Sequence, residues 1–152
     1  MNDNNQTEIT DEWVEHVAIG GAILGGGGGG SLTEGIEFGK LAVEYGSPRL
    51  RSVSDLDASE VVLTVSGVGA PAAADSDVKP ADYVRAVRLI INRLNEHGRT
   101  VAALMTNEMG GFASVNGLLQ SAVTGLPILD AACNGVDRPV RRRDCVTGRC
   151  RR

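Results

Sequence analysis

Three short segments of this chain combine glycine with polar side chains that could bind a small molecule or act on it. They are Gly67–Pro71 (GVGAP), Asn107–Gly111 (NEMGG) and Asp130–Gly135 (DAACNG). Each follows an apolar run that is typical of a buried strand. Because ligands bind beyond the carboxyl ends of the strands in open parallel sheets, we expect the three segments to meet there and form a site. The alternative is that Gly, Asn and Asp serve only the backbone conformation of each turn.

Glu108 is the residue best suited to acid–base chemistry, because it is the only charged residue between Thr100 and Leu129. Burial at this position would raise the pKa of its carboxyl group and suit it to proton transfer. The alternative is that Glu108 stabilises the N-terminus of the helix that follows it. We assign candidate catalytic roles to Glu108 and its neighbour Asn107.

Amide side chains accompany these segments and indicate the kind of ligand. Asn107, Asn116 and Asn134 can each donate and accept hydrogen bonds, which suits an amide-like or imide-like molecule. Asp130 either orients such a ligand or fixes its own turn, and the turn is the favoured interpretation. The predicted ligand-binding residues of this group are Asn116, Asp130, Cys133, Asn134 and the glycines Gly69, Gly110 and Gly111.

Cys133 could act as a nucleophile only with a nearby base or a depressed pKa. The chain has two histidines, His16 and His97, and both lie far from Cys133 in the sequence. A small buried apolar residue is therefore the favoured interpretation of Cys133.

The run of glycines at 25–30, followed by Ser31, could bind an anion through its N–H groups or allow a ligand to approach the backbone closely. A flexible hinge between two helices is the alternative. The preceding segment has a helical pattern where a dinucleotide-binding fold needs a strand, and no Gly-Lys-Ser/Thr follows, so a Walker loop is excluded. The predicted ligand-binding residues here are Gly25, Gly26, Gly27, Gly28, Gly29, Gly30 and Ser31.

Helices and strands must position these residues, and they alternate in the second half of the chain. We expect helices over 11–24, 32–44, 80–96 and 112–123 and strands over 49–53, 61–65, 100–105 and 127–130. The pattern is typical of parallel strands joined by right-handed crossovers. The sequence therefore predicts an α/β fold with a short, mostly parallel sheet flanked by helices in Rossmann-like layering.

Charge divides the chain unevenly. Residues 1–137 carry 8 Lys+Arg and 18 Asp+Glu, a net charge of −10, whereas 138–152 carry 7 Arg and one Asp, a net charge of +6. The acidic body gives no electrostatic reason to bind nucleic acid, so no nucleic-acid partner is expected. We divide the chain into a disordered lead-in over 1–9, an α/β domain over 10–137 and a basic tail over 138–152.

No membrane segment is expected. The uncharged stretch Met109–Leu129 is long enough to span a bilayer, but it holds four glycines, Pro127 and several polar residues. The chain begins with a polar, acidic segment unlike a signal peptide, and its three cysteines fit a reducing, cytoplasmic setting. Cys145 and Cys150 lack two further nearby ligands, so no metal site is predicted, and no cofactor is assigned.

Four blocks in this order carry a family resemblance: GAILGGGGGGS (21–31), VGAP (68–71), TNEMGG (106–111) and LPILDAACNG (126–135). Over about residues 12–135 the chain resembles the N-terminal domain of the S-methyl thiohydantoin desulfurase family, formerly a domain of unknown function. The resemblance implies an α/β domain, genomic association with hydantoin and oxoproline hydrolases, and five-membered cyclic imide-like substrates. It places the family's three motifs on 25–31, 107–111 and 130–135.

The resemblance ends after Asn134-Gly135. Family members continue with an Arg-Ala-His-Pro-like stretch and a second domain, whereas this chain continues with VDRPVRRRDC. Our hypothesis is a frameshift or a misread end that leaves a truncated N-terminal domain and an out-of-frame tail. Sequencing of the gene past this point is expected to find the family continuation in another frame. A genuine basic tail is the alternative.

Three functions follow from these residues and the resemblance. The first is a domain, in truncated form, of an enzyme that acts on S-methyl thiohydantoin or hydantoin-like cyclic imides. The second is a non-catalytic binding module or an accessory subunit to a hydantoinase- or oxoprolinase-type hydrolase. The third is a phosphate- or nucleotide-binding domain. The expected partners are a cyclic imide-like small molecule and a missing second domain or partner subunit.

Overall fold

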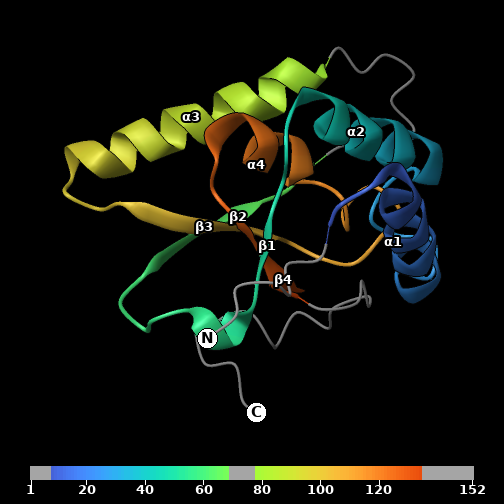
Figure 1. Ribbon diagram of the computed structural model, residues 1–152, viewed down its shortest axis with the longest axis horizontal. Coiled ribbons are helices and arrows are strands. Elements are labelled where there is room, and N and C mark those ends of the chain that lie inside the picture. The colour runs from blue at the N-terminus through green and yellow to red at the C-terminus, as the bar shows by residue number, and fades with distance from the viewer. Residues whose placement is uncertain (1–7, 69–77, 135–152) are drawn as a thin grey trace.

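The computed structural model describes residues 8–68 and 78–134 (Figure 1). The helices are α1 (Asp11–Leu24), α2 (Leu32–Tyr45), α3 (Pro80–Glu96) and α4 (Leu118–Thr124), and Val53–Asp55 form the short 3₁₀ helix η1. The strands are β1 (Leu50–Arg51), β2 (Val61–Val65), β3 (Val101–Thr106) and β4 (Ile128–Ala132). The basic tail and Gly69 lie outside the described residues.

The four strands form one parallel sheet in the order β1-β4-β3-β2. Leu104 of β3 and Leu50 of β1 both align with Ile128 of β4, and Val65 of β2 aligns with Thr106 of β3. Helix α3 connects β2 to β3, and α4 connects β3 to β4. The predicted α/β fold is confirmed, and the carboxyl ends of β2, β3 and β4 lie at the same edge of the sheet.

The core lies between the sheet and its helices. In Figure 1, α2, α3 and α4 lie above the strands, and η1 lies below them. Helix α4 contacts both α2 and α3, and α1 packs against α2. Aliphatic side chains fill the space between these elements, which fits a chain with 3% aromatic residues. The most deeply buried valines and leucines are Val14, Leu104, Val115, Leu118 and Leu129.

Local sequence signals start α1, α2 and α3 where they were expected. The Thr10 hydroxyl accepts a hydrogen bond from the Trp13 N–H and caps α1. Pro80 occupies the first position of α3, where its missing N–H has no helical partner to lose. The Ser31 hydroxyl accepts from the Glu34 N–H at 3.3 Å and caps α2. These boundaries place the glycine run between α1 and α2.

The helix expected over 112–123 begins six residues later, at Leu118. The N–H groups of Phe112 and Ala113 both donate to the Gly29 carbonyl, at 3.1 and 2.8 Å. Gly117 then adopts φ +114°, outside the range of a right-handed helix. Residues 111–117 form successive turns, which the Gly29 carbonyl holds through its two hydrogen bonds, and the left-handed Gly117 separates these turns from the regular helix that begins at Leu118.

An ion pair between Arg51 and Glu60 links β1 to the start of β2. The two guanidinium nitrogens donate to the two carboxylate oxygens at 2.9 and 2.8 Å, and each side chain is 25% exposed. The Arg51 guanidinium, and then the Asp57 N–H, hold the pKa of the Glu60 carboxyl below its usual value. The pair therefore contributes stability that depends on pH.

We expect this contribution to be fully present above about pH 4.3, the unfolded-state pKa of a glutamate, and to be lost as pH falls through the lower folded-state pKa. The variant Glu60→Gln should unfold at a lower temperature than the parent chain near neutral pH. The difference should shrink in acid. Thermal unfolding followed by circular dichroism across this pH range measures it. Glu96→Gln, which breaks a pair whose side chains are 67% and 62% exposed, is the control and should show little effect.

Candidate functional site

Asn107 connects the ends of three adjacent strands. Its N–H donates to the Val65 carbonyl of β2 at 3.1 Å, and its carbonyl accepts from the Asn134 N–H at 2.8 Å. The two side chains also meet, because the Asn134 amide nitrogen donates to the Asn107 Oδ1 at 3.3 Å. The Cys133 N–H donates to the Thr106 carbonyl at 3.0 Å. The segments that follow β3 and β4 are thus held together with the end of β2.

The glycine loop, residues 25–30, packs directly on the segment after β3. A Cβ atom built on Gly110 would lie 2.3 Å from the Gly29 Cα and 2.7 Å from the Gly29 carbonyl oxygen. A Cβ on Gly25 would lie 2.8 Å from the Met109 carbonyl oxygen. Backbone meets backbone at these contacts, so only glycine fits without displacement. Close packing of two loops therefore requires several glycines of the run.

The exposed part of the glycine loop has a different character. Gly26 and Gly27 adopt φ +59° and +93°, and a Cβ on either would meet no atom within 4 Å. The N–H groups of Gly25, Gly26 and Gly28 donate to backbone carbonyls of residues 21, 23 and 25. The Ser31 hydroxyl is engaged in capping α2. The loop therefore offers an open backbone surface. Some of its N–H groups already have hydrogen-bond partners within the protein.

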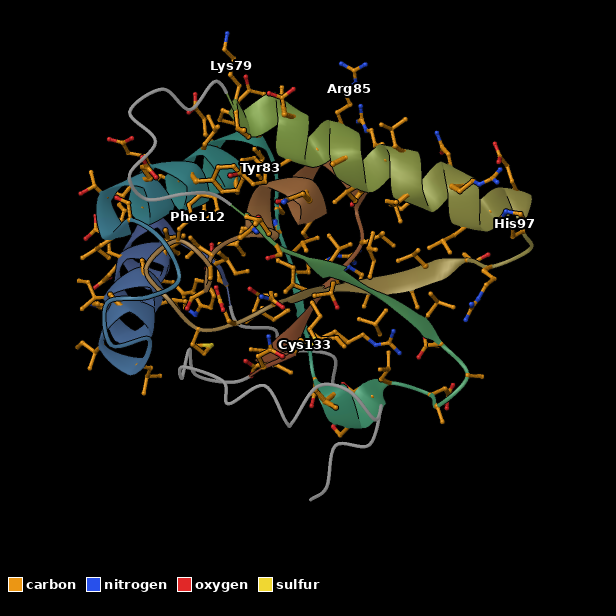
Figure 2. All side chains as sticks on the ribbon, turned by 180° about the vertical axis from the view of Figure 1, so that it is seen from behind. Lys79, Tyr83, Arg85, His97, Phe112 and Cys133 are labelled. Atoms are coloured by element: carbon orange, nitrogen blue, oxygen red, sulfur yellow. The ribbon has the colours of Figure 1, made fainter. Side chains whose placement is uncertain are left out.

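Three aromatic rings lie beside these loops, and sequence reasoning missed them. The ring centroids of Phe38, Tyr83 and Phe112 are 5.2 to 5.6 Å apart. Figure 2 shows Tyr83 and Phe112 close together between the helices and the strand ends. A Cβ on Gly67, after β2, would lie 3.4 Å from the Tyr83 hydroxyl. The scarcity of aromatic residues in the sequence could have directed attention to them, because three of the five Phe, Tyr and Trp residues of the chain lie in this cluster.

The Tyr83 hydroxyl lies in an environment that disfavours its ionisation. Burial raises the pKa of the Tyr83 hydroxyl, and the negative charge of Glu34 raises it further. At neutral pH the phenol is therefore protonated, and it can donate a hydrogen bond beside Gly67.

The remaining candidates differ in placement. Glu108 is half-buried directly after Asn107, and its carbonyl lies 3.4 Å from the Thr106 hydroxyl. Asp130 is exposed within β4, which continues to Ala132, so the interpretation that it fixes a turn is wrong. Cys133 is an exposed free thiol, so the expectation of a buried apolar residue is also wrong, because the residue lies beyond the end of β4. His97 is at the far end of α3, well separated from Cys133 in Figure 2. The second histidine, at position 16, is exposed on α1.

Asn116 is placed inside the fold. It is 3% exposed, and its Oδ1 accepts from the Gln120 amide nitrogen at 2.9 Å. The Gln120 Oε1 in turn accepts from the Gly117 N–H at 3.1 Å. The structure thus gives Asn116 a role in the turn before α4 and does not bring it to the loop surface with Asn107 and Asn134.

The described parts of the chain, 8–68 and 78–134, hold no group of three His, Cys, Asp or Glu side chains arranged to bind a metal ion. Within the same residues, no helix combines the length and the apolar character needed to cross a membrane.

The parallel sheet, its crossover helices and the joined strand-end loops define an α/β domain with a glycine-lined edge. The family described as "S-Me-THD-like, N-terminal domain" matches residues 12–138, and the chain belongs to this family. None of the curated proteins matches the chain significantly. A crystal structure of a protein from Chromobacterium violaceum is similar in fold, with 24% sequence identity and a TM-score of 0.65. The match covers 84% of this chain and 34% of that one.

Proposed function

We infer that this chain supplies part of the active site of an enzyme that acts on S-methyl thiohydantoin or on hydantoin-like cyclic imides. The observation that supports this most is the Asn107–Asn134 pair at the ends of three strands. A carboxamide presents a donor and an acceptor side by side, which complements the N–H and C=O edge of a cyclic imide. The family membership of residues 12–138 agrees with this substrate class.

The neighbouring groups suit such a ring. The exposed glycines of the loop permit close approach of a flat molecule to the backbone, since no side chain intervenes. The Tyr83 hydroxyl can donate to a ring oxygen, and the Phe112 ring beside it provides an apolar surface. The proposed site therefore lies between the glycine loop, the aromatic rings and the two asparagines.

Hydrolysis of an S-methyl thiohydantoin exchanges one C–S bond for a C–O bond. A water molecule adds to the ring carbon, methanethiol leaves, and a hydantoin remains. In this proposal the Glu108 carboxylate takes a proton from the water and returns it to the departing thiolate. Asn107 holds the ring so that the reacting carbon faces Glu108. Because the match covers one third of the Chromobacterium chain, a second domain or a partner subunit is proposed to complete the site.

Methanethiol release measured with a thiol reagent tests this function on the chain as it exists. Because the reacting groups of the proposal all lie on this chain, we expect slow turnover of S-methyl thiohydantoin even without the second domain, lowered about 10²-fold by Glu108→Gln, the range for loss of a general base. Asn107→Ala should lower it about tenfold, the loss of one to two hydrogen bonds. Glu44→Gln on the exposed face of α2 and Asn95→Ala at the end of α3 are matched controls and should leave turnover unchanged.

Other outcomes contradict the catalytic proposal. Saturable binding of the ring without turnover, unaffected by Glu108→Gln, would identify a non-catalytic binding module. Protection of residues 25–30 from hydrogen exchange by a nucleotide, with no effect of the ring compound, would identify a nucleotide-binding domain. If the chain neither turned over the ring compound nor bound the ring compound or the nucleotide, all three functions would be rejected.

A further inference from the structure

A groove of about 600 Å³ runs between α2 and α3, away from the strand-end loops. Leu41 and Tyr45 of α2 form one wall, and Leu119 and Val123 of α4 form the floor. The other wall is a stripe along α3 that includes Val84. Apart from the cations described next, the lining is mainly apolar, and Tyr45 remains 69% exposed at the rim. The described residues, 8–68 and 78–134, therefore leave an apolar channel between two helices open to solvent.

Three positive charges lie along the α3 wall of this groove. Lys79, Arg85 and Arg88 line it, and none of the described Asp or Glu residues does. Lys79, which precedes α3, and Arg85 are exposed, and Figure 2 shows their side chains extending outward, so their charges reach solvent. These are three of the eight Lys and Arg residues in 1–137, a region of net charge −10. The concentration of cations on one wall is therefore unusual for this molecule.

The spacing of the charges indicates the shape of an occupant. Lys79 and Arg88 are about 14 Å apart along the helix axis, at 1.5 Å per residue. A ligand with one anionic group could pair with one or two of these cations. A helix with apolar residues at i, i+3, i+4 and i+7 would fill the floor, and acidic residues along one flank would face all three cations. We propose that this groove docks an acidic amphipathic helix of a partner protein.

The proposal is independent of the reaction at the strand ends, and synthetic helices test it directly. The probe is a labelled peptide of about 14 residues with leucines at the i, i+3, i+4 and i+7 positions and glutamates along one flank. A second peptide carries lysine in place of each glutamate. Fluorescence anisotropy is expected to show binding of the glutamate peptide at least about tenfold tighter than that of the lysine peptide.

Charge reversal in the protein should invert this preference. Arg85→Glu with Arg88→Glu is expected to weaken the glutamate peptide about tenfold and to strengthen the lysine peptide. Arg93→Glu with Arg99→Glu makes the same change in net charge at exposed positions outside the groove lining and should alter neither affinity more than about twofold. Circular dichroism verifies that each variant is folded.

Four results would overturn the proposal. The first is equal binding of the two peptides or equal effects of the two double variants, and the second is no binding of either peptide. The third is displacement of the peptide by dodecanoate, together with charge-reversal variants that change the affinity for dodecanoate but not the affinity for the peptides. This result would indicate a small anionic ligand. The fourth is a concentration-dependent dimer in sedimentation velocity, lost in the Arg85→Glu and Arg88→Glu variant, which would identify a second copy as the occupant.

Discussion

Replacement of Gly110 by alanine is expected to lower the free energy of unfolding by about 3 kcal/mol or more, the range for a forced clash in a packed interior. The new methyl group would lie 2.3 Å from the Gly29 Cα, 2.7 Å from the Gly29 carbonyl oxygen and 2.8 Å from the Gly28 carbonyl oxygen. All three atoms belong to the backbone, so no change of rotamer can relieve the contact. The glycine loop would have to move away from the segment after β3.

The movement would also break the hydrogen bonds from the Phe112 and Ala113 N–H groups to the Gly29 carbonyl. Urea unfolding followed by the single Trp13 measures the loss of stability. Gly20→Ala in α1 is the matched control. A Cβ there meets no atom within 4 Å, so alanine should stabilise the helix by about 0.5–1 kcal/mol. A Gly110→Ala variant as stable as the parent would show that the two loops are not packed as described.

Gln120→Leu is expected to destabilise the chain by about 3 kcal/mol, because two buried polar groups would each lose their partner. Gln120 is 1% exposed and bonds both the Asn116 Oδ1 and the Gly117 N–H. Leucine has nearly the same size, so the loss reports the hydrogen bonds and little packing. Denaturant unfolding measures it. Thr124→Val, at a half-buried position on the same helix, is the comparison variant, because it removes one hydrogen-bonded hydroxyl group. It should lower the free energy of unfolding by about 1 kcal/mol.

The variant Gln120→Glu separates hydrogen bonding from shape. A protonated carboxyl can accept from Gly117 and donate to Asn116, as the amide does. Burial raises the folded-state pKa of the introduced carboxyl above its unfolded value of about 4.3. Its stabilising contribution is therefore present below about pH 4.3 and is lost as pH rises through the folded-state pKa. Stability relative to the parent chain should improve on acidification, and a difference that does not change with pH would contradict the described network.

Strong local signals allowed most elements to be predicted. The β-branched run Val61–Val65 forms β2 as expected, and Pro80 starts α3. The predicted start of α4 was wrong, because Gly117 adopts φ +114° and interrupts the helix. The turns before it are held by the Gly29 carbonyl, more than 80 residues away in the sequence. Ile90 is 47% exposed although its spacing fits the apolar face of α3. The spacing of apolar residues in a helix does not indicate which of them pack against another element.

The site could be predicted in outline. Parallel topology placed Asn107 and Asn134 at one edge, and the structure joins them. The role of Asn116 inside the fold depends on Gln120, four residues later, which carries no chemical signature on its own. The contact of Tyr83 with Phe112 joins α3 to the turns before α4 and arises only from tertiary packing. The sequence was sufficient to predict which polar residues lie at the strand ends. It was not sufficient to predict which residues of the covering helices pack beside them.

The pairing of β1 has a consequence for the order of folding. β1, at Leu50–Arg51, pairs in the sheet with β4, at Ile128–Ala132, and these strands are nearly 80 residues apart. Closing so long a loop costs entropy before any contact is gained, and parallel pairings of this kind fold slowly. During synthesis, β1 must wait unpaired until β4 has left the ribosome. The first half of the chain therefore emerges with an open strand edge, and its yield in the cell should depend on the rate at which the second half is made.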